Sequence, residues 1–246
     1  MRVGRLGPGT GVTWTRIQAT AGAVALTTAV AIAYEILRAG FTAGALPTLL
    51  LFYGGSAAII IAFSVWTAAE IGLPSLLALS QLPWRERVAR WVVLGLGLGV
   101  VLALASIALS RGAEAPLQPW FWRRIQTPVG AALFSARAAL LEETFFRLFL
   151  IPFLVSVALR ARPVRHRLKL AGGSARAVHD RAQAGTLLII VACALSSVMF
   201  GLAHPFNPVG AVLLGPLLAI AYLWGGWESA VTAHFVANSI LFVVYY

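Results

Sequence analysis

Long apolar blocks separated by short polar segments run along most of the chain. Each block is long enough for a helix to cross the hydrocarbon core of a membrane, which takes about 20 residues. The pattern predicts membrane-spanning helices at 17–37, 46–67, 90–110, 128–159, 185–203, 209–225 and 228–245. The blocks follow one another too closely for a separate soluble domain, and no internal repeat is visible. We therefore expect an all-α fold, a polytopic transmembrane helical bundle of about seven spans, within a range of about six to eight.

Composition supports this assignment. Hydrophobic residues make up 60% of the 246 residues and charged residues only 11%, whereas soluble domains average about 25% charged residues. The mean hydropathy is +0.86. Indole side chains collect at membrane interfaces, and seven tryptophans stand at or just beyond the predicted span ends: Trp66, Trp84, Trp91, Trp120, Trp122, Trp224 and Trp227. Residues 68–84 are apolar but interrupted by glycine and prolines, which indicates an interfacial segment more than a further span.

The net charge of +11 is concentrated in the connecting segments. Residues 160–184 hold seven of the 19 Lys and Arg residues, which predicts a cytoplasmic loop. If the spans alternate, a second basic cluster and the N-terminal arginines lie on the same side: Arg85, Arg87, Arg90, Arg2, Arg5 and Arg16. The N-terminus is then cytoplasmic, and the first apolar block is longer than a signal peptide requires, which favours a retained anchor. Three arginines count against this orientation, since they would lie outside: Arg111, Arg123 and Arg124.

The stretch LLEETFFRLF, inside the apolar block 128–159, holds three formal charges. A charged residue at the centre of a membrane helix costs about 2.5–3.5 kcal/mol on insertion scales and usually faces the bundle interior. Glu143 and Arg147 are four residues apart, so they share a helix face and can pair. Glu142 lies about 100° further round the helix. It has no cation of its own, since Arg137, five positions away, is a poor helical partner. The spacing favours structural support for the pair and chemistry for Glu142.

Two histidines lie in or beside apolar blocks. Phe200 and His204 share one helix face, and His234 and Asn238 share another, because each pair is four residues apart. A single histidine of this kind is more often a core residue than a catalyst. Two of them, with an unpaired carboxylate and few other polar side chains in the bundle, indicate a catalytic site. The remaining histidines lie in the basic loop: His166 and His179.

Three motifs follow in a specific order on successive hydrophobic segments. They are Glu-Glu-x-x-x-Arg at 142–147, Phe-x-x-x-His at 200–204 and His-x-x-x-Asn at 234–238. In this order they resemble the CAAX protease and bacteriocin-processing family of intramembrane endopeptidases, also called the abortive-infection family. The resemblance covers 128–246, so a CAAX-protease-like catalytic core is expected there, including the basic loop 160–184, and N-terminal transmembrane helices with an interfacial segment in 1–127. The expected location is the cell membrane of a prokaryote.

Peptide hydrolysis needs an activated water, a stabiliser for the oxyanion and a proton source for the leaving amine. Glu142 suits the general base, because desolvation makes a carboxylate more basic. His204 suits sharing and orienting the water. His234 and Asn238 can present hydrogen-bond donors to the oxyanion. The family resemblance implies the same division of roles, and supporting or orienting roles are expected for Glu143, Arg147 and Phe200.

A zinc-dependent alternative uses the same side chains. Two histidines and one glutamate that leave an open position form a known catalytic zinc set. Here that set is Glu142, His204 and His234. No His-Glu-x-x-His run is present, so catalysis without a metal or another cofactor is the preferred prediction. The only cysteine, Cys193, excludes an intrachain disulfide and lies about 16 Å along a straight helix from His204, too far for a nucleophile that this histidine activates.

The expected substrate is a membrane-associated peptide or protein, for example a CAAX-type or bacteriocin-like one. Competing hypotheses are a non-catalytic membrane scaffold or immunity protein and a transporter, since intramembrane charges and histidines also build proton relays. The presence of all three motifs favours the enzyme. Anionic lipid is the expected partner of the basic loops. Nucleic acid is not an expected partner, and the sequence does not specify the oligomeric state.

One feature conflicts with a shared site. If the spans alternate strictly, the helices that hold His204 and His234 run in the same direction. His204 ends its block, whereas His234 lies near the start of its own. The two side chains then lie at different depths, unless the 209–225 helix is tilted or crosses only part of the membrane.

Overall fold

The structure is a computed structural model, and it describes residues 14–40, 43–71, 73, 83–110, 127–161, 175–204 and 208–245. All regular elements in these ranges are helical, which confirms the all-α prediction. The helices are α1 (Trp14–Ala39), η1 (Ala43–Ala45), α2 (Leu46–Leu49), η2 (Leu50–Gly55), α3 (Ser56–Ile71), α4 (Trp84–Arg90), η4 (Trp91–Gly97), α5 (Leu98–Ser110), α7 (Pro128–Glu143), η5 (Thr144–Leu150), α8 (Ile151–Arg160), α10 (Ala175–Leu202) and α11 (Pro208–Tyr245). The segments η2, η4 and η5 are π-helical and join their neighbours into longer rods.

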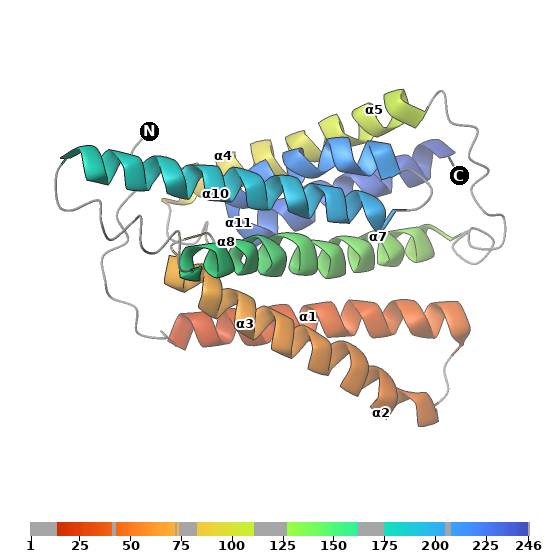
Figure 1. Cartoon of the computed structure of the whole chain (residues 1–246). Helices are drawn as coiled ribbons and strands as arrows, with labels where there is room; N and C mark the ends of the chain where they lie inside the picture. Colours follow the sequence, from red (N-terminus) through yellow and green to blue (C-terminus); the bar gives the residue numbers. More distant parts are fainter. Residues whose placement is uncertain are drawn as a thin grey trace.

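Five of the described helices are long and apolar enough to cross a membrane. They are Ile17–Ala39, Leu46–Ala68, Trp84–Leu109, Gly185–Leu202 and Pro208–Val244. The chain is therefore an integral membrane protein. The rod formed by α7, η5 and α8 carries the intramembrane charges and runs through the middle of the bundle (Figure 1). Its outline agrees with the predicted span 128–159, while the total number of spans stays a prediction.

Helix α11 is divided by a kink at Gly226. This residue has φ 78° and ψ −179°, a conformation that L-residues with a side chain rarely adopt. In Figure 1 the first half of α11 runs away from the end of the bundle where the C-terminus lies, and the second half returns toward it. The kink falls between the predicted spans 209–225 and 228–245, so glycine supplies the turn that separates them.

Two sequence predictions are adjusted by the helix bounds. Helix α10 begins at Ala175, so the last part of the expected basic loop 160–184 is helical. The helix at 84–110 likewise begins earlier than the predicted 90–110 span and includes the arginines of the second basic cluster. Other predictions fall outside the described residues: most of 68–84, the loop at 162–174, Arg2, Arg5, Arg111, Arg123, Arg124, Trp120 and Trp122.

The described tryptophans separate into two groups. Four of them are well exposed on the bundle, as interfacial anchors should be: Trp66, Trp84, Trp91 and Trp224. Trp227 is different, because it is buried beside the kink and its Nε1–H donates to Thr144 Oγ1 at 3.2 Å. The expectation that Trp227 lies at a membrane interface is therefore wrong. It joins α11 to η5 instead.

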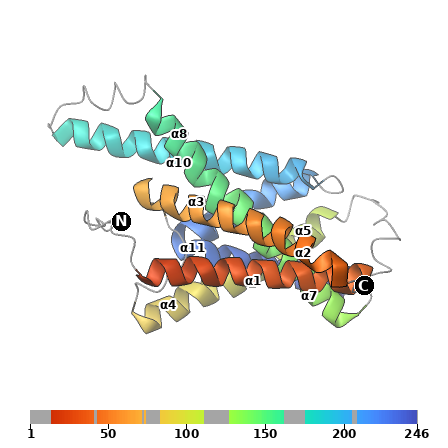
Figure 2. The same ribbon diagram turned by 90° about the horizontal axis from the view of Figure 1, so that it is seen from below.

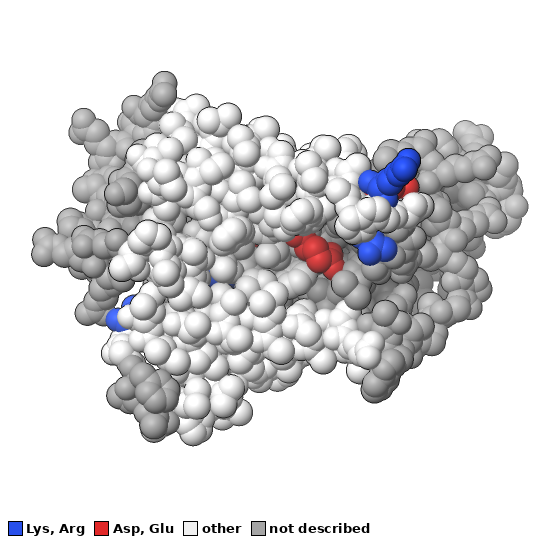
Figure 3. All heavy atoms as spheres, turned by 180° about the vertical axis from the view of Figure 1, so that it is seen from behind, with Lys and Arg blue, Asp and Glu red and all other residues white. Residues whose placement is uncertain are grey.

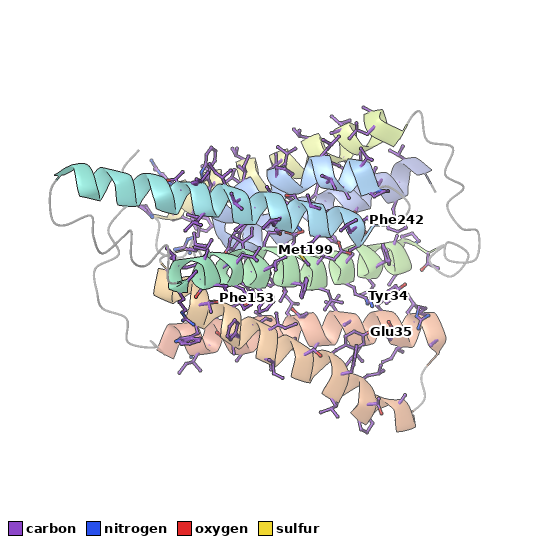
Figure 4. All side chains as sticks on the ribbon, in the orientation of Figure 1. Tyr34, Glu35, Phe153, Met199 and Phe242 are labelled. Carbon is purple, nitrogen blue, oxygen red and sulfur yellow. The ribbon has the colours of Figure 1, made fainter. Side chains whose placement is uncertain are left out.

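The packing places α11 against α5, α7 and α10, and α8 along both α3 and α10 (Figures 1 and 2). Tyr34 contacts the ring of Phe134, which contacts Phe242, so aromatic side chains connect α1, α7 and α11 near one end of the bundle (Figure 4). Outward-facing positions are mostly large and apolar, as lipid contact requires. The face in Figure 3 shows few charged atoms, with Asp and Glu atoms in a hollow near its middle.

Candidate active site

The two glutamates stand where α7 passes into η5. The start of this rod is fixed by Thr127, whose side chain accepts a hydrogen bond from Gly130 N at 3.0 Å, and by Pro128 in the first turn. The rod continues without a break through the charged stretch, but η5 winds as a π-helix from Thr144 to Leu150. Single π-helical turns inside α-helices are frequent at functional sites.

The expected ion pair between Glu143 and Arg147 is present. Arg147 Nε lies 3.3 Å from Glu143 Oε2, and the side chains are 1% and 0% exposed. Arg147 also donates from Nη2 to the carbonyl oxygen of Gly215 at 3.3 Å, and its guanidinium lies 4.3 Å from the centre of the Phe200 ring. This buried cation thus connects η5 with both α10 and α11.

His204 reaches Glu142 because of the way α10 ends. The backbone N–H of His204 bonds Gly201 O instead of Phe200 O. The carbonyl of Phe200 is then available, and it lies 2.7 Å from His204 Nδ1. A carbonyl is only an acceptor, so Nδ1 carries the proton. The other ring nitrogen, Nε2, lies 3.3 Å from Glu142 Oε2.

His234 approaches the same carboxylate from the second half of α11. Its Nδ1 lies 2.8 Å from Glu143 Oε1, and its Nε2 lies 3.8 Å from Glu142 Oε2. Helix α5 packs closely behind it, because a Cβ on Gly99 would lie 2.8 Å from the carbonyl oxygen of Ala233. Glycine at position 99 therefore allows α11 to come this near.

These contacts remove the conflict in depth between the two histidines. His204 and His234 both face one oxygen atom of Glu142, although they lie on successive spans of the predicted topology. The Phe200 ring lies beside both imidazoles, at centroid distances of 4.3 Å from His204 and 5.8 Å from His234. The structure thus brings together Glu142, Glu143, Arg147, Phe200, His204 and His234.

Asn238 lies one helical turn beyond His234 on α11 and is half-buried. Its side-chain amide makes no hydrogen bond within the described residues. Its part in the site therefore stays a prediction.

The exposed fractions give the cluster an open and a closed side. Glu142 and His204 are 28% and 33% exposed, whereas His234 is 7% exposed. The Glu143 and Arg147 pair lies on the closed side. A substrate can therefore reach Glu142 and His204 first. Within the described ranges, no group of three His, Cys, Asp or Glu side chains is arranged to hold a metal ion.

Three contacts of the site were not predicted from the sequence. They are the bonds between Glu143 and His234, between Trp227 and Thr144, and from Ser196 Oγ to the carbonyl oxygen of Phe146 at 2.7 Å. The last bond satisfies a carbonyl of the π-helical segment. A signal was present for Ser196 and Thr144, because both are small polar residues inside apolar blocks. No spacing rule points from His234 to Glu143.

Comparison with known proteins agrees with the motif-based resemblance. Residues 124–240 match the family model described as type II CAAX prenyl endopeptidase Rce1-like. The matched region is a little less than half of the chain and contains all three motifs, from Glu142 to Asn238. No curated protein and no solved structure gives a significant match. The family prediction is confirmed over residues 124–240, where the chain matches the Rce1-like type II CAAX prenyl endopeptidase family.

Proposed function

We propose that this protein is an intramembrane endopeptidase that hydrolyses peptide bonds of membrane-associated substrates with a water molecule activated by Glu142. The observation that carries the proposal is the convergence of two histidine Nε2 atoms on one carboxylate oxygen, at 3.3 Å and 3.8 Å. Carboxylate and imidazole are the two groups that serve most often as general bases and acids. The family match supports a protease of the CAAX type.

In the proposed reaction, Glu142 takes a proton from the water as the water oxygen attacks the carbonyl carbon of the substrate. His204 orients this water from the open side of the cluster. The oxyanion that forms receives hydrogen bonds from His234 Nε2–H and from the Asn238 amide, a contribution worth about 3–4 kcal/mol per donor in other enzymes. Protonated Glu142 then gives its proton to the amine nitrogen as the C–N bond breaks. The products are a carboxylic acid and an amine, and Glu142 returns to its starting form.

The surroundings of the cluster favour a substrate held at the membrane. Phe146 and Phe200 pack at a centroid distance of 5.3 Å beside the polar groups, and both are buried. The helices around them expose large apolar side chains to the exterior. We propose a peptide or protein with a membrane-anchored segment as the substrate class, and C-terminal CAAX-type sequences are the first candidates to test.

The test is cleavage of membrane-presented peptides by the wild-type protein and by Glu142→Gln, in detergent and in lipid vesicles. Gln keeps the shape of the side chain and removes the base, so cleavage should fall by about 10²–10⁴-fold, the range that general bases contribute. The yield of folded protein should stay unchanged. Glu35→Gln is the matched control, since Glu35 is also an intramembrane glutamate but makes its contacts with Arg38, Tyr53 and Arg137. A Glu142→Gln protein that cleaves at the wild-type rate overturns the proposal.

A chelator separates this mechanism from the zinc alternative. We expect turnover to persist in a tight zinc chelator, because the proposed base and donors are all side chains of the protein. Loss of activity that added zinc restores would replace the proposed mechanism with a metal-dependent one at the same residues.

A further inference from the structure

Helix α11 is interrupted at Gly226, and the carbonyls beside this interruption are bonded by side chains. Carbonyl groups at the end of a helical segment need donors from outside that segment. Arg90 Nη1 donates to the carbonyl oxygen of Trp224 at 3.2 Å. Ser229 Oγ donates to the carbonyl oxygen of Gly225 at 3.0 Å. The last turn before the kink is thus bound by a residue of α4, which lies at the same end of the bundle as the kink (Figures 1 and 2).

The next residue of the chain binds the other half of α11. Trp91 Nε1–H donates to Thr232 Oγ1 at 3.2 Å, and Thr232 Oγ1 donates to the carbonyl oxygen of Glu228 at 2.8 Å. Thr232 stands two residues before His234. Two consecutive residues, Arg90 and Trp91, therefore bond α11 on both sides of its kink.

The rod that carries these two donors also lies very close to the second half of α11. A Cβ on Gly95 would lie 3.1 Å from Thr232 Cβ, and a Cβ on Gly99 would lie 2.7 Å from Val236 Cβ. Trp91, Gly95 and Gly99 follow one another at intervals of four residues, so one face of this rod contacts α11. The glycines allow the approach, while the hydrogen bonds specify where along the rod each half of α11 is held.

Both donors lie near the surface of the bundle. Trp91 is 40% exposed, and the side chain of Arg90 is 42% exposed and also bonds Glu86 at 2.7 Å. Polar contacts at exposed positions contribute little to stability. Their effect is therefore expected in the direction of the second half of α11, more than in folding. This direction matters, because the same half holds His234 Nε2 3.8 Å from Glu142 Oε2.

We infer that Arg90 and Trp91 are positioning residues, which set the angle of the α11 kink and thereby hold His234 opposite Glu142. This inference rests on the proposed function. It gives the rod of α4, η4 and α5 a part in turnover, although this rod lies outside the matched residues 124–240. A displacement of about 1 Å caused far from the reacting atoms can lower a rate about 10²-fold.

The first test measures the kink and does not depend on cleavage. In a Cys193→Ala background, nitroxide labels are attached through Leu213→Cys and Val243→Cys, one on each half of α11, at positions 56% and 85% exposed. Pulsed electron resonance then gives the distribution of distances between the labels. We expect a narrow distribution in the otherwise wild-type protein, and a shifted or broader one after Arg90→Gln with Trp91→Phe. An unchanged distribution overturns the inference.

The matched control is Arg85→Gln with Trp84→Phe. It makes the same two replacements at consecutive positions of α4, where both side chains are exposed. Neither side chain has a part in the proposed contact with α11. The distance distribution and kcat of this control should therefore match the wild-type protein, and a change equal to that of the first double variant overturns the inference.

The second test follows turnover per folded molecule, which a loss of stability alone would not lower. Trp91→Phe and Thr232→Val each remove one bond and should each lower kcat about tenfold. KM should change less than about twofold, because the contact of His234 is used in the transition state. Together the two changes should cost no more than either alone, since they remove the same bond. Thr232→Ser keeps the hydroxyl group and should turn over within about twofold of the wild-type rate.

Arg90→Gln with Trp91→Phe loses both bonds and should lower kcat about 10²-fold. The inference requires both this loss and the change in the label distances, and wild-type kcat in the double variant overturns it. Should that variant not fold, Trp91→Phe and Thr232→Val decide alone, and a kcat that is normal in both has the same consequence.

These measurements also separate the inference from the proposed function. If Glu142→Gln cleaves normally, the proposed function is wrong, and the label distances still decide whether Arg90 and Trp91 set the kink. If cleavage depends on Glu142 but the Arg90→Gln, Trp91→Phe protein keeps wild-type kcat and label distances, the inference alone is wrong.

Discussion

Two clusters of charged side chains lie inside the same bundle, and they differ in how far they are closed. The first, which we call the site cluster, consists of Glu142, Glu143, Arg147, His204 and His234. The second, the α1–α7 cluster, consists of Tyr34, Glu35, Arg38, Tyr53 and Arg137. Its charged side chains keep exposed fractions of 13% for Glu35, 26% for Arg137 and 42% for Arg38. In the site cluster the Glu143 and Arg147 pair is sealed.

The hydrogen bonds and ion pairs of the two clusters differ as their exposed fractions do. In the α1–α7 cluster Glu35 accepts from Arg38 at 2.8 Å and from Tyr53 at 3.0 Å, while Arg137 stays 3.6 Å from Glu35 and 5.0 Å from the ring of Tyr34. Figure 4 shows Tyr34 and Glu35 near one end of the bundle, where α1 faces α7. Such partly open charges keep some solvation and contribute little. Sealed charges must be balanced by one another, which fixes their geometry. The site cluster therefore differs from the α1–α7 cluster by a sealed and balanced ion pair, which lies behind the more open side chains of Glu142 and His204.

The largest difference between the clusters is expected in stability. Arg147→Ala or Glu143→Ala strands one buried charge, at a cost of about 3–5 kcal/mol. Arg137→Ala, as the control in the α1–α7 cluster, removes a partly exposed cation and should cost about 1 kcal/mol or less. Unfolding in detergent by titration with dodecyl sulfate, together with the monodisperse yield, measures both effects. Equal losses at positions 147 and 137 would show that enclosure does not distinguish the clusters.

A substitution at Asn238 tests whether a residue beside the site cluster can contribute to catalysis without contributing to the stability of the fold. Asn238→Ala removes one proposed oxyanion donor, so kcat should fall about 10²–10³-fold. The folded yield should remain at the wild-type level, in contrast to Arg147→Ala. Asn238→Asp keeps the size of the side chain but replaces the amide donor with a carboxylate, and it should be at least as inactive. Loss of folded protein in Asn238→Ala equal to that of Arg147→Ala contradicts this separation of roles.

The spacing of residues along the chain predicted those features of the fold and of the site that form within a single helix. The apolar blocks gave the helices, because about 20 apolar residues in sequence are enough to specify a span. The four-residue spacing gave the ion pair of Glu143 with Arg147, since i and i+4 side chains share a face. The order of the motifs gave the family, which the match over residues 124–240 confirms.

Contacts between helices were beyond the reach of the sequence. The partners Glu143 and His234 are 91 positions apart, and their meeting depends on the turn at Gly226 and on the close approach of α5 at Gly99. The spacing excluded Arg137 as a helical partner of Glu142 but indicated no other partner for it, and in the structure Glu35 on α1 lies 3.6 Å away. Trp227 was predicted to lie at a membrane interface because it stands at a span end, but beside the kink its side chain is buried and bonds Thr144.

A smaller effect is expected from the hydroxyl group that connects α10 with η5. Ser196→Ala leaves the buried carbonyl oxygen of Phe146 without its donor, at a cost of about 1–3 kcal/mol. Ser197→Ala is the matched control, since Ser197 Oγ donates to Cys193 O of its own helix at 2.8 Å and this carbonyl belongs to the helical ladder. Dodecyl sulfate unfolding of the two variants should separate them, with Ser196→Ala the less stable. Equal stability would show that η5 does not depend on this bond.

The smallest effects should come from the potential nucleophiles near the site cluster. Cys193 precedes His204 by a distance of about 16 Å along α10, and Ser197 is occupied by the bond to Cys193 O. Ser239 Oγ is buried without a hydrogen-bond partner among the described residues, so no base is in place to activate it. Cys193→Ala, Ser197→Ala and Ser239→Ala should therefore each cleave a membrane-presented peptide within about twofold of the wild-type rate, because Glu142 with a water molecule replaces a side-chain nucleophile. The assay runs beside Glu142→Gln, which should be inactive. If one of the three variants loses activity while its folded yield is normal, the chemistry depends on a nucleophile outside the site cluster, and the site cluster would no longer identify where the reaction takes place.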